Sequence, residues 1–217
     1  MTPQTSPRAT LILVRHGETE GESSIRYHGR NDVPLSELGR AQMRAARAAI
    51  ETDHGGLAFE RVFTSPLVRA AEGARIIASA DAPAPVALEE FAEVHFGDFE
   101  GLTREEISAR FPDEYVRWRA DPLSPAYTYP GGENRAAFTA RVERGVVLML
   151  SQWVPERAPG ATRALLVAHR GVIRTTVKTL AGAEPSVELG SIHILEYADR
   201  WKPAALDLVA HLADVRG

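Results

Sequence analysis

The chain has 217 residues, of which 44% are hydrophobic and 25% are charged, and its formal net charge is −4. This balance is typical of a globular protein and argues against a chain built mainly to bind nucleic acid or an anionic membrane. Because the sequence contains no cysteine, disulfides, thiolate metal sites and cysteine nucleophiles are excluded. No apolar run approaches the roughly 20 residues that span a bilayer. We therefore expect a soluble, cytoplasmic protein in which residues 1–9 form a loose tail.

Apolar runs alternate with helical stretches along the sequence. In chain order we expect a strand at Thr10–Val14, a helix at Ser36–Ile50, a strand at Arg61–Thr64, a helix at Pro66–Ala78, a strand at Pro85–Leu88, helices at Thr103–Arg110 and Pro112–Trp118, a long helix after Asn134, a strand at Ala164–Ala168, a helix at Val172–Leu180 and strands at Ile192–Tyr197 and Ala205–Ala210. This order predicts an α/β fold, a three-layer α/β/α sandwich around a mostly parallel central sheet.

Local signals mark several helix ends and faces. Ser65 and Pro66 suit an N-cap and the first helical position, Thr103 and Glu106 form a capping-box pattern, and Asn134 suits an N-cap. The apolar face expected on the first helix comprises Leu38, Ala41, Ala45, Ala49 and Ile50. The inner face expected on the long helix comprises Phe138, Val142, Val146, Met149 and Trp153.

The sequence predicts one domain over residues 1–217, without internal repeats. The Pro- and Gly-rich stretches at Asp81–Pro85, Asp121–Gly132 and Pro155–Gly160 are loops too short to be domain linkers. We expect His95–Gly132 to leave the sheet as a small helical excursion beside the active site. Its aromatic residues Trp118, Tyr127 and Tyr129 either line the pocket or pack this excursion.

Polar residues follow the ends of the first four strands. Arg15 and His16 come directly after the first strand, and Arg69 lies one turn into the helix after the second. Glu93 follows the third strand after a few residues, and His169 follows the fourth. In open α/β sheets, ligands bind beyond the carboxyl ends of the strands. We therefore expect these five side chains to converge at one edge of the sheet.

The five side chains suit a phosphoryl group. Arginines offer forked donors that match phosphate oxygens, and a neutral imidazole is a nucleophile able to form a covalent intermediate. The proton on its other nitrogen has to be held, for example by a backbone carbonyl. Glu93 could protonate the leaving alkoxide, although Glu89 and Glu90 are alternatives. Arg15, Arg69 and His169 would hold the transferring group. The sequence indicates no cofactor and no metal site.

Six segments resemble the histidine phosphatase superfamily, the phosphoglycerate-mutase-like group, in the family's order along nearly the whole chain. They are LILVRHGETE, DVPLSELGRAQ, TSPLVRAAEGA, EVHFGDFEGLT, PGGEN and VAHRGVIR. The resemblance implies that His16 is the phosphorylated nucleophile and Glu93 the proton donor. It further implies that Arg15, Arg69 and His169 complete the phosphate pocket.

Two positions depart from the family pattern. Glu22 stands where members often have Asn, so its carboxylate either turns away from the phosphate or contacts a positive part of the substrate. Arg170 stands where many members have Gly and adds a cation near the pocket rim. By the same resemblance, Arg26, His28 and Gly29 line the pocket entrance and belong to the candidate substrate-binding residues.

The block Phe96–Gly101 resembles the phosphatase branch more closely than the mutases, which usually carry a Tyr-Gly version of it. We expect a metal-independent phosphatase acting on a small phosphate monoester such as a sugar phosphate. The alternatives are a phosphoglycerate-mutase-type phosphotransferase, a metallohydrolase that uses His16, His169 and carboxylates as ligands, and a non-catalytic phosphate binder. Neither nucleic acid nor membrane is an expected partner, and a homodimer is one of the open assemblies.

Overall fold

The central element of the fold is a six-stranded sheet in the order β3-β2-β4-β1-β5-β6. The computed structural model describes residues 8–153 and 161–215. The strands are β1 (Ala9–Arg15), β2 (Arg61–Thr64), β3 (Val86–Ala87), β4 (Thr162–Ala168), β5 (Ile192–Tyr197) and β6 (Trp201–Leu208). The first four strands run parallel, whereas β5 and β6 extend the sheet antiparallel on the β1 side. The predicted mostly parallel sheet is confirmed.

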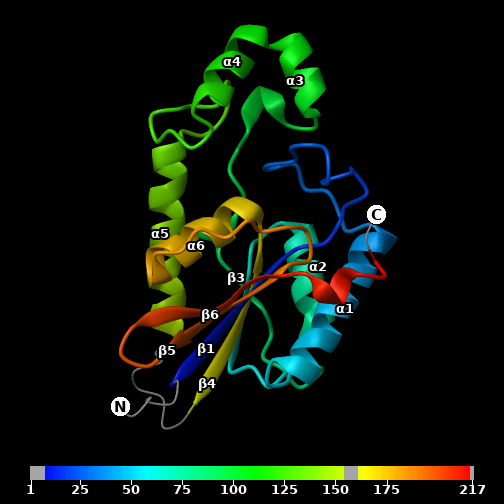
Figure 1. Cartoon of the computed structure of the whole chain (residues 1–217), viewed down its shortest axis with the longest axis vertical. Helices are drawn as coiled ribbons and strands as arrows, with labels where there is room; N and C mark the ends of the chain where they lie inside the picture. The colour runs from blue at the N-terminus through cyan, green and yellow to red at the C-terminus, as the bar shows by residue number, and fades with distance from the viewer. Residues whose placement is uncertain (1–7, 154–160, 216–217) are drawn as a thin grey trace.

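Helices cover both faces of this sheet (Figure 1). The helices α1 (Glu37–Asp53) and α2 (Val68–Ile77) lie on one face, and α5 (Arg135–Gln152) and α6 (Arg170–Ala181) lie on the other. Successive residues of β1 point to opposite faces, as a strand requires. Leu11 and Leu13 pack in the core with α5 and α6, whereas Ile12 and Val14 pack with α1 and α2. This alternation produces the predicted three-layer α/β/α sandwich.

The segment after β3 forms an excursion beyond the carboxyl ends of the parallel strands (Figure 1). The turn η1 (Glu89–Phe91) precedes it and buries Phe91 in the core, and the excursion contains the 3₁₀ turn η2 (Gly97–Phe99) and the helices α3 (Arg104–Arg110) and α4 (Pro112–Ala120). Trp118 and Tyr129 are buried, and both contact the Phe99 ring. These aromatics therefore pack the excursion and do not line the cavity described below. No helix in the described part of the chain combines the length and apolar composition needed to cross a bilayer.

Most local signals predicted their helix ends correctly. Thr103 and Glu106 form the predicted capping box, and Asn134 caps α5 through two backbone N–H groups. The inner face of α5 is buried as expected. The exception is Ser65–Pro66, because α2 begins only at Val68 with Leu67 as its N-cap. The Ser65 hydroxyl accepts the Leu67 N–H and contacts the His169 ring, so it is engaged elsewhere.

The predicted apolar face of α1 is confirmed only at its end, where Ile50 is buried and Ala49 packs against the core. The buried residues are Gly39, Gln42, Met43, Ala46 and Ile50. The spacing of the alanines misplaced the buried face, because a close approach between two backbone segments determines which face of α1 points to the core. A Cβ built at Gly17 would lie 2.5 Å from the Gly39 carbonyl oxygen, so only two glycines allow this contact.

The ends of the sheet also differ from the prediction. Ala9 is the first residue of β1, and the Arg8 N–H donates to the Tyr197 carbonyl, so these two residues belong to the sheet. The rest of the expected tail and the loop at Pro155–Gly160 lie outside the described residues. The last strand was expected at Ala205–Ala210 but begins at Trp201 and ends before η4 (Ala210–Leu212). As an edge strand paired only with β5, β6 tolerates exposed residues that hide its strand pattern.

We predict that Gly39→Ala destabilises the fold by about 1–3 kcal/mol, because the new methyl group would overlap the Glu18 carbonyl oxygen. Alanine is the better helix former by about 1 kcal/mol, so helix propensity acts in the opposite direction. Urea denaturation measures the free energy of unfolding. Arg44→Ala, at an exposed position of α1, is the matched control and should change it by less than about 0.5 kcal/mol. Equal stability of Gly39→Ala and wild type would contradict the close approach.

Candidate active site

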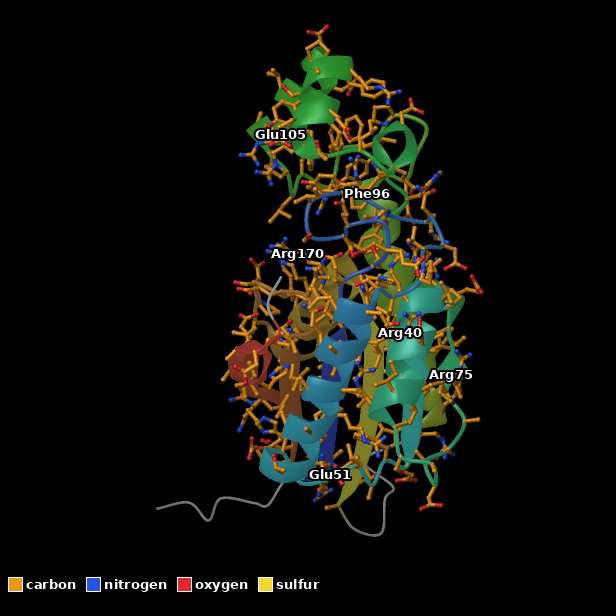
Figure 2. All side chains as sticks on the ribbon, turned by 90° about the vertical axis from the view of Figure 1, so that its right-hand side faces the viewer. Arg40, Glu51, Arg75, Phe96, Glu105 and Arg170 are labelled. Atoms are coloured by element: carbon orange, nitrogen blue, oxygen red, sulfur yellow. The ribbon has the colours of Figure 1, made fainter. Side chains whose placement is uncertain are left out.

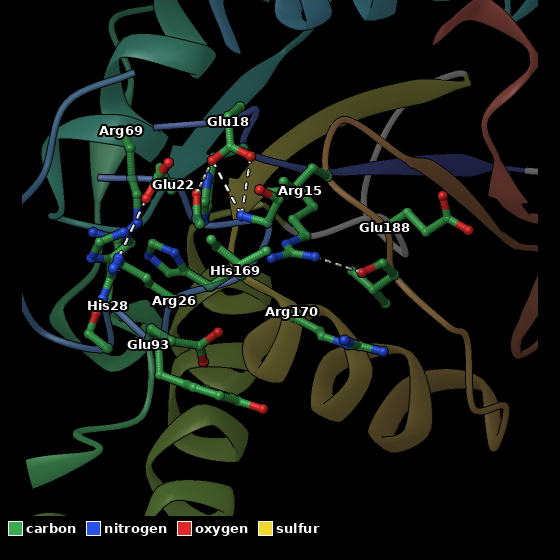
Figure 3. A pocket seen from close by; sticks show the side chains of 18 of the residues that line it. Arg15, Glu18, Glu22, Arg26, His28, Arg69, Glu93, His169, Arg170 and Glu188 are labelled. Atoms are coloured by element: carbon green, nitrogen blue, oxygen red, sulfur yellow. Dashed lines mark hydrogen bonds and ion pairs between the residues drawn. The ribbon is translucent and has the colours of Figure 1, made fainter. Parts of the chain in front are cut away.

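A cavity of about 840 Å³ lies between the sheet and the excursion. Figure 2 shows Phe96 and Glu105 of the excursion on its upper side and Arg170, at the start of α6, below. The cavity is lined by every candidate site residue from the sequence, namely Arg15, His16, Glu22, Arg26, His28, Gly29, Arg69, Glu93, His169 and Arg170 (Figure 3). The structure thus brings together residues from both ends of the chain.

His16 follows β1 and is held in one tautomer. Its Nδ1 lies 2.7 Å from the Gly17 carbonyl oxygen. Because a carbonyl only accepts, Nδ1 carries the proton and Nε2 keeps a free lone pair. The ring is 4% exposed, and burial together with the charges of Arg69 and Arg15 keeps the pKa of His16 well below its usual value. The imidazole is therefore neutral at neutral pH, as a nucleophile must be.

His169 follows β4 and faces His16, with the ring centroids 5.1 Å apart. Its Nε2 lies 2.7 Å from the hydroxyl oxygen of Ser65, which is fully buried. Its Nδ1 is also buried and has no hydrogen-bond partner among the described residues. Burial and the neighbouring Arg69 lower the pKa of His169 well below its usual value. An unpartnered polar atom beside the His16 ring suits contact with a ligand oxygen.

Two guanidiniums flank the imidazoles and are held by carbonyl oxygens. Arg69 is 2% exposed and donates to the carbonyls of Asn31 at 2.7 Å and Gly29 at 2.8 Å. Arg15 donates to the Val187 carbonyl at 3.1 Å, and burial and nearby Arg170 lower its pKa to about 10. Neither guanidinium has an ion-pair partner in the described ranges. Two guanidiniums in the cavity that are not engaged in ion pairs create a site for an anion.

Glu93 is 9% exposed and has a fixed orientation. Its two carboxylate oxygens accept the N–H groups of Val94 at 3.0 Å and Gly171 at 3.1 Å. A Cβ built at position 171 would lie 2.5 Å from Glu93 Oε1, so glycine allows the carboxylate to approach the start of α6. The alternative acids Glu89 and Glu90 are in η1 and do not line the cavity.

The pocket rim carries charges with different partners. Glu22, in the left-handed region with φ 59°, is turned towards Arg26, with Oε2 3.4 Å from Nε. Arg26 also donates to Glu106 at 2.7 Å. Arg170 is exposed and has no ion pair within the described residues, so the two departures from the family pattern do not pair. His28 donates from Nε2 to the Gly21 carbonyl at 2.5 Å, and burial lowers its pKa.

The sequence did not identify two residues that hold this site. Ser65, which fixes the His169 ring, was read only as a helix cap, although it stands directly after β2. Val187, whose carbonyl accepts from Arg15, carries no signal because 172 positions separate the two residues and the acceptor is a backbone atom. Glu188 and Leu189 also line the cavity and were not expected there.

Known proteins resemble this chain in sequence. A family model described as histidine phosphatase superfamily (branch 1) matches residues 11–204. The 2,3-bisphosphoglycerate-dependent phosphoglycerate mutase 2 of Gloeobacter violaceus is 35% identical over 82% of this chain and 78% of that protein. A glucosyl-3-phosphoglycerate phosphatase of Mycolicibacterium vanbaalenii is 32% identical over 79% of this chain and 74% of that protein. A bifunctional protein of Mycobacterium tuberculosis is 36% identical over 87% of this chain and 50% of that protein. The chain therefore spans about half the length of that relative.

The fold also resembles solved structures. A putative α-ribazole-5′-P phosphatase from Escherichia coli superposes with a TM-score of 0.79 at 26% identity. The match covers 92% of this chain and 96% of that chain. The resemblance therefore includes the sheet, the helical layers and the excursion.

Because the His16 and His169 imidazoles are buried, we predict that the free energy of unfolding decreases as the pH falls below about 6.5. In the unfolded chain both rings regain an ordinary pKa near 6.5, whereas the folded pKa values of His16 and His169 lie well below it. The unfolded state then binds more protons, so the free energy of unfolding decreases by up to about 1.4 kcal/mol per pH unit for each ring. Urea denaturation measures the free energy of unfolding between about pH 7.5 and 5.5. We expect this free energy to depend less steeply on pH in His169→Gln than in wild type. Equal slopes would contradict the depressed pKa.

Proposed function

The chain belongs to branch 1 of the histidine phosphatase superfamily, and we propose that it is a phosphomonoesterase that transfers the substrate phosphoryl group to His16 and then to water. The observation that carries this proposal is the His16 ring itself. It is buried and neutral, its proton is held on Nδ1 by Gly17, and two guanidiniums that form no ion pair within the described residues flank it. This arrangement supports nucleophilic attack on a bound dianion.

In the first step, the lone pair on His16 Nε2 attacks phosphorus. The bond between phosphorus and the ester oxygen breaks, and the leaving alkoxide takes a proton from Glu93. Arg15 and Arg69 stabilise the charge on the transferring group, and His169 offers the hydrogen bond that its free Nδ1 allows. The products of this step are the alcohol and phosphohistidine.

In the second step, water attacks the phosphorus of the phosphohistidine. The Glu93 carboxylate takes a proton from this water, and the nitrogen–phosphorus bond breaks. Inorganic phosphate leaves, His16 Nε2 regains its lone pair, and Glu93 is again protonated. The backbone N–H groups of Val94 and Gly171 keep the carboxylate in the same position during both steps.

The substrate we propose is a small phosphate monoester, and the reaction needs no metal ion. The names of the phosphatase relatives, which refer to glucosyl-3-phosphoglycerate and α-ribazole phosphate, support a small phosphorylated substrate. Arg15 and Arg69 supply the positive charge that a metal would otherwise provide. Within the described residues, no group of three or more His, Asp or Glu side chains is arranged to hold a metal ion.

A phosphoglycerate-mutase-type phosphotransferase is the second candidate, and the similarity to the Gloeobacter violaceus mutase favours it. Such an enzyme would use the same phosphohistidine but return the phosphoryl group to a second substrate oxygen. We predict that the protein, mixed with 3-phosphoglycerate and a bisphosphoglycerate primer, gives no rapid isomerisation. Separation of the two phosphoglycerates by ion-exchange chromatography measures this. Rapid formation of 2-phosphoglycerate without release of phosphate would establish the mutase instead.

The covalent route predicts that His16→Ala loses at least about 1,000-fold in kcat on an aryl phosphate such as p-nitrophenyl phosphate, because the variant lacks the nitrogen that accepts the phosphoryl group in the first step. Release of p-nitrophenol measures the rate. His54→Ala is the matched control, since His54 caps the C-terminus of α1 and lies outside the cavity. Retention of most of the activity by His16→Ala would reject a phosphohistidine intermediate.

A further inference from the structure

A polar cluster at the edge of the sheet, formed by Asp207, His193 and Ser191, takes no part in the reaction proposed above. It lies next to Val187, whose carbonyl holds Arg15. Val187 and Asp207 have φ values of 60° and 55°, and Glu22 is the third non-glycine residue in the described chain with a positive φ. A β-branched residue in the left-handed region is strained. Two strained residues in contact therefore need a structural reason.

A β-bulge explains the conformation of Asp207. In the antiparallel pair, Ile192 faces Leu208 and Ile194 faces Ala205, so one residue of β5 lies opposite two of β6. The extra residue turns the Asp207 side chain away from the regular alternation of side chains along β6. This turn directs the Asp207 carboxylate towards the loop before β5.

The carboxylate binds two consecutive backbone N–H groups of this loop. Asp207 Oδ2 accepts from Ser186 at 3.0 Å, and Oδ1 accepts from Val187 at 2.9 Å. Hydrogen bonds to a charged acceptor are stronger than those between neutral groups. They offset the strain at Val187 and fix the direction of its carbonyl. That carbonyl is the only hydrogen-bond acceptor of the Arg15 side chain within the described residues.

The bulge itself is held by a buried, neutral imidazole. The Asp207 N–H donates to His193 Nδ1 at 3.2 Å, so Nδ1 is unprotonated. The Ser191 hydroxyl donates to the Glu188 carbonyl at 2.7 Å and accepts from His193 Nε2 at 3.0 Å. Burial lowers the pKa of His193 to about 4, which agrees with a neutral ring. The hydrogen bonds are therefore consistent with one tautomer.

From this chain of contacts we infer that Asp207 is a positioning residue, which orients the Arg15 guanidinium towards the phosphoryl group through the Val187 carbonyl. Asp207 does not touch the substrate. The inference rests on the proposed function, because Arg15 matters for the reaction only if a phosphoryl group binds beside His16. The inference gives the bulge on β6 a role in the active site, although Asp207 and Arg15 are 192 positions apart in the sequence.

The test is a double-mutant cycle between positions 15 and 207. Asp207→Gly keeps the left-handed backbone without strain but removes both acceptors, so the variant should fold. We expect it to lower kcat/KM for p-nitrophenyl phosphate about 10-fold, with Asp207→Asn, which keeps one acceptor, intermediate. In the Arg15→Lys background, which lacks the guanidinium fork, Asp207→Gly should change kcat/KM by less than about twofold.

Asp199→Ala is the matched control, because Asp199 is an exposed acid in the turn between β5 and β6, and its removal should leave kcat/KM unchanged. Equal losses from Asp207→Gly in both backgrounds, or no loss in a folded Asp207→Gly variant, would overturn the inference. Calorimetric titration with orthovanadate repeats the cycle without turnover, and coupled losses in affinity support the inference. If the wild type is inactive but positions 15 and 207 are coupled in orthovanadate affinity, the proposed function is refuted and the positioning role of Asp207 is retained.

Discussion

Arg15 and Arg69 are guanidiniums inside the protein with no carboxylate at ion-pair distance in the described chain, and the rest of the pocket depends on this constraint. The Val187 carbonyl accepts one hydrogen bond from Arg15, and the Asn31 and Gly29 carbonyls accept two from Arg69. Carbonyl oxygens orient a guanidinium but do not neutralise it. The remaining positive charge is costly in the empty protein and is compensated when an anion enters. The same electrostatics that oppose folding thus favour a phosphoryl group.

This positive charge also sets the state of the histidines. A protonated imidazole beside two arginines would be repelled, so burial and charge together keep His16 and His169 neutral. The Gly17 carbonyl then decides which nitrogen of His16 carries the proton. In the proposed reaction His16 therefore attacks without any change of its protonation state. The excursion covers one side of the cavity and contributes Phe96, Arg104 and Glu105 to its lining.

The supports of the site come from elements that carry no reacting group. The contact between Gly17 and Gly39 seats α1 against the loop after β1, and Gln42 of the same helix accepts the Glu18 N–H at 2.8 Å. At the β6 edge of the sheet, Asp207 binds the backbone of Val187 and holds the loop before β5. Backbone strain such as that at Val187 persists only where neighbouring hydrogen bonds over-determine the backbone. A helix on one face of the sheet and an edge strand therefore both contribute to the geometry of the site.

The sequence by itself determined the three layers, most helix ends and the meeting of Arg15, His16, Arg69, Glu93 and His169, because strand alternation and caps are local and parallel strands end at one edge of a sheet. It misplaced the inner face of α1, since alanine periodicity says nothing about where two backbones touch. It could not assign Ser65 to His169 or Val187 to Arg15. Those contacts depend on hydroxyl and carbonyl directions across distant segments, which only the packed tertiary structure decides.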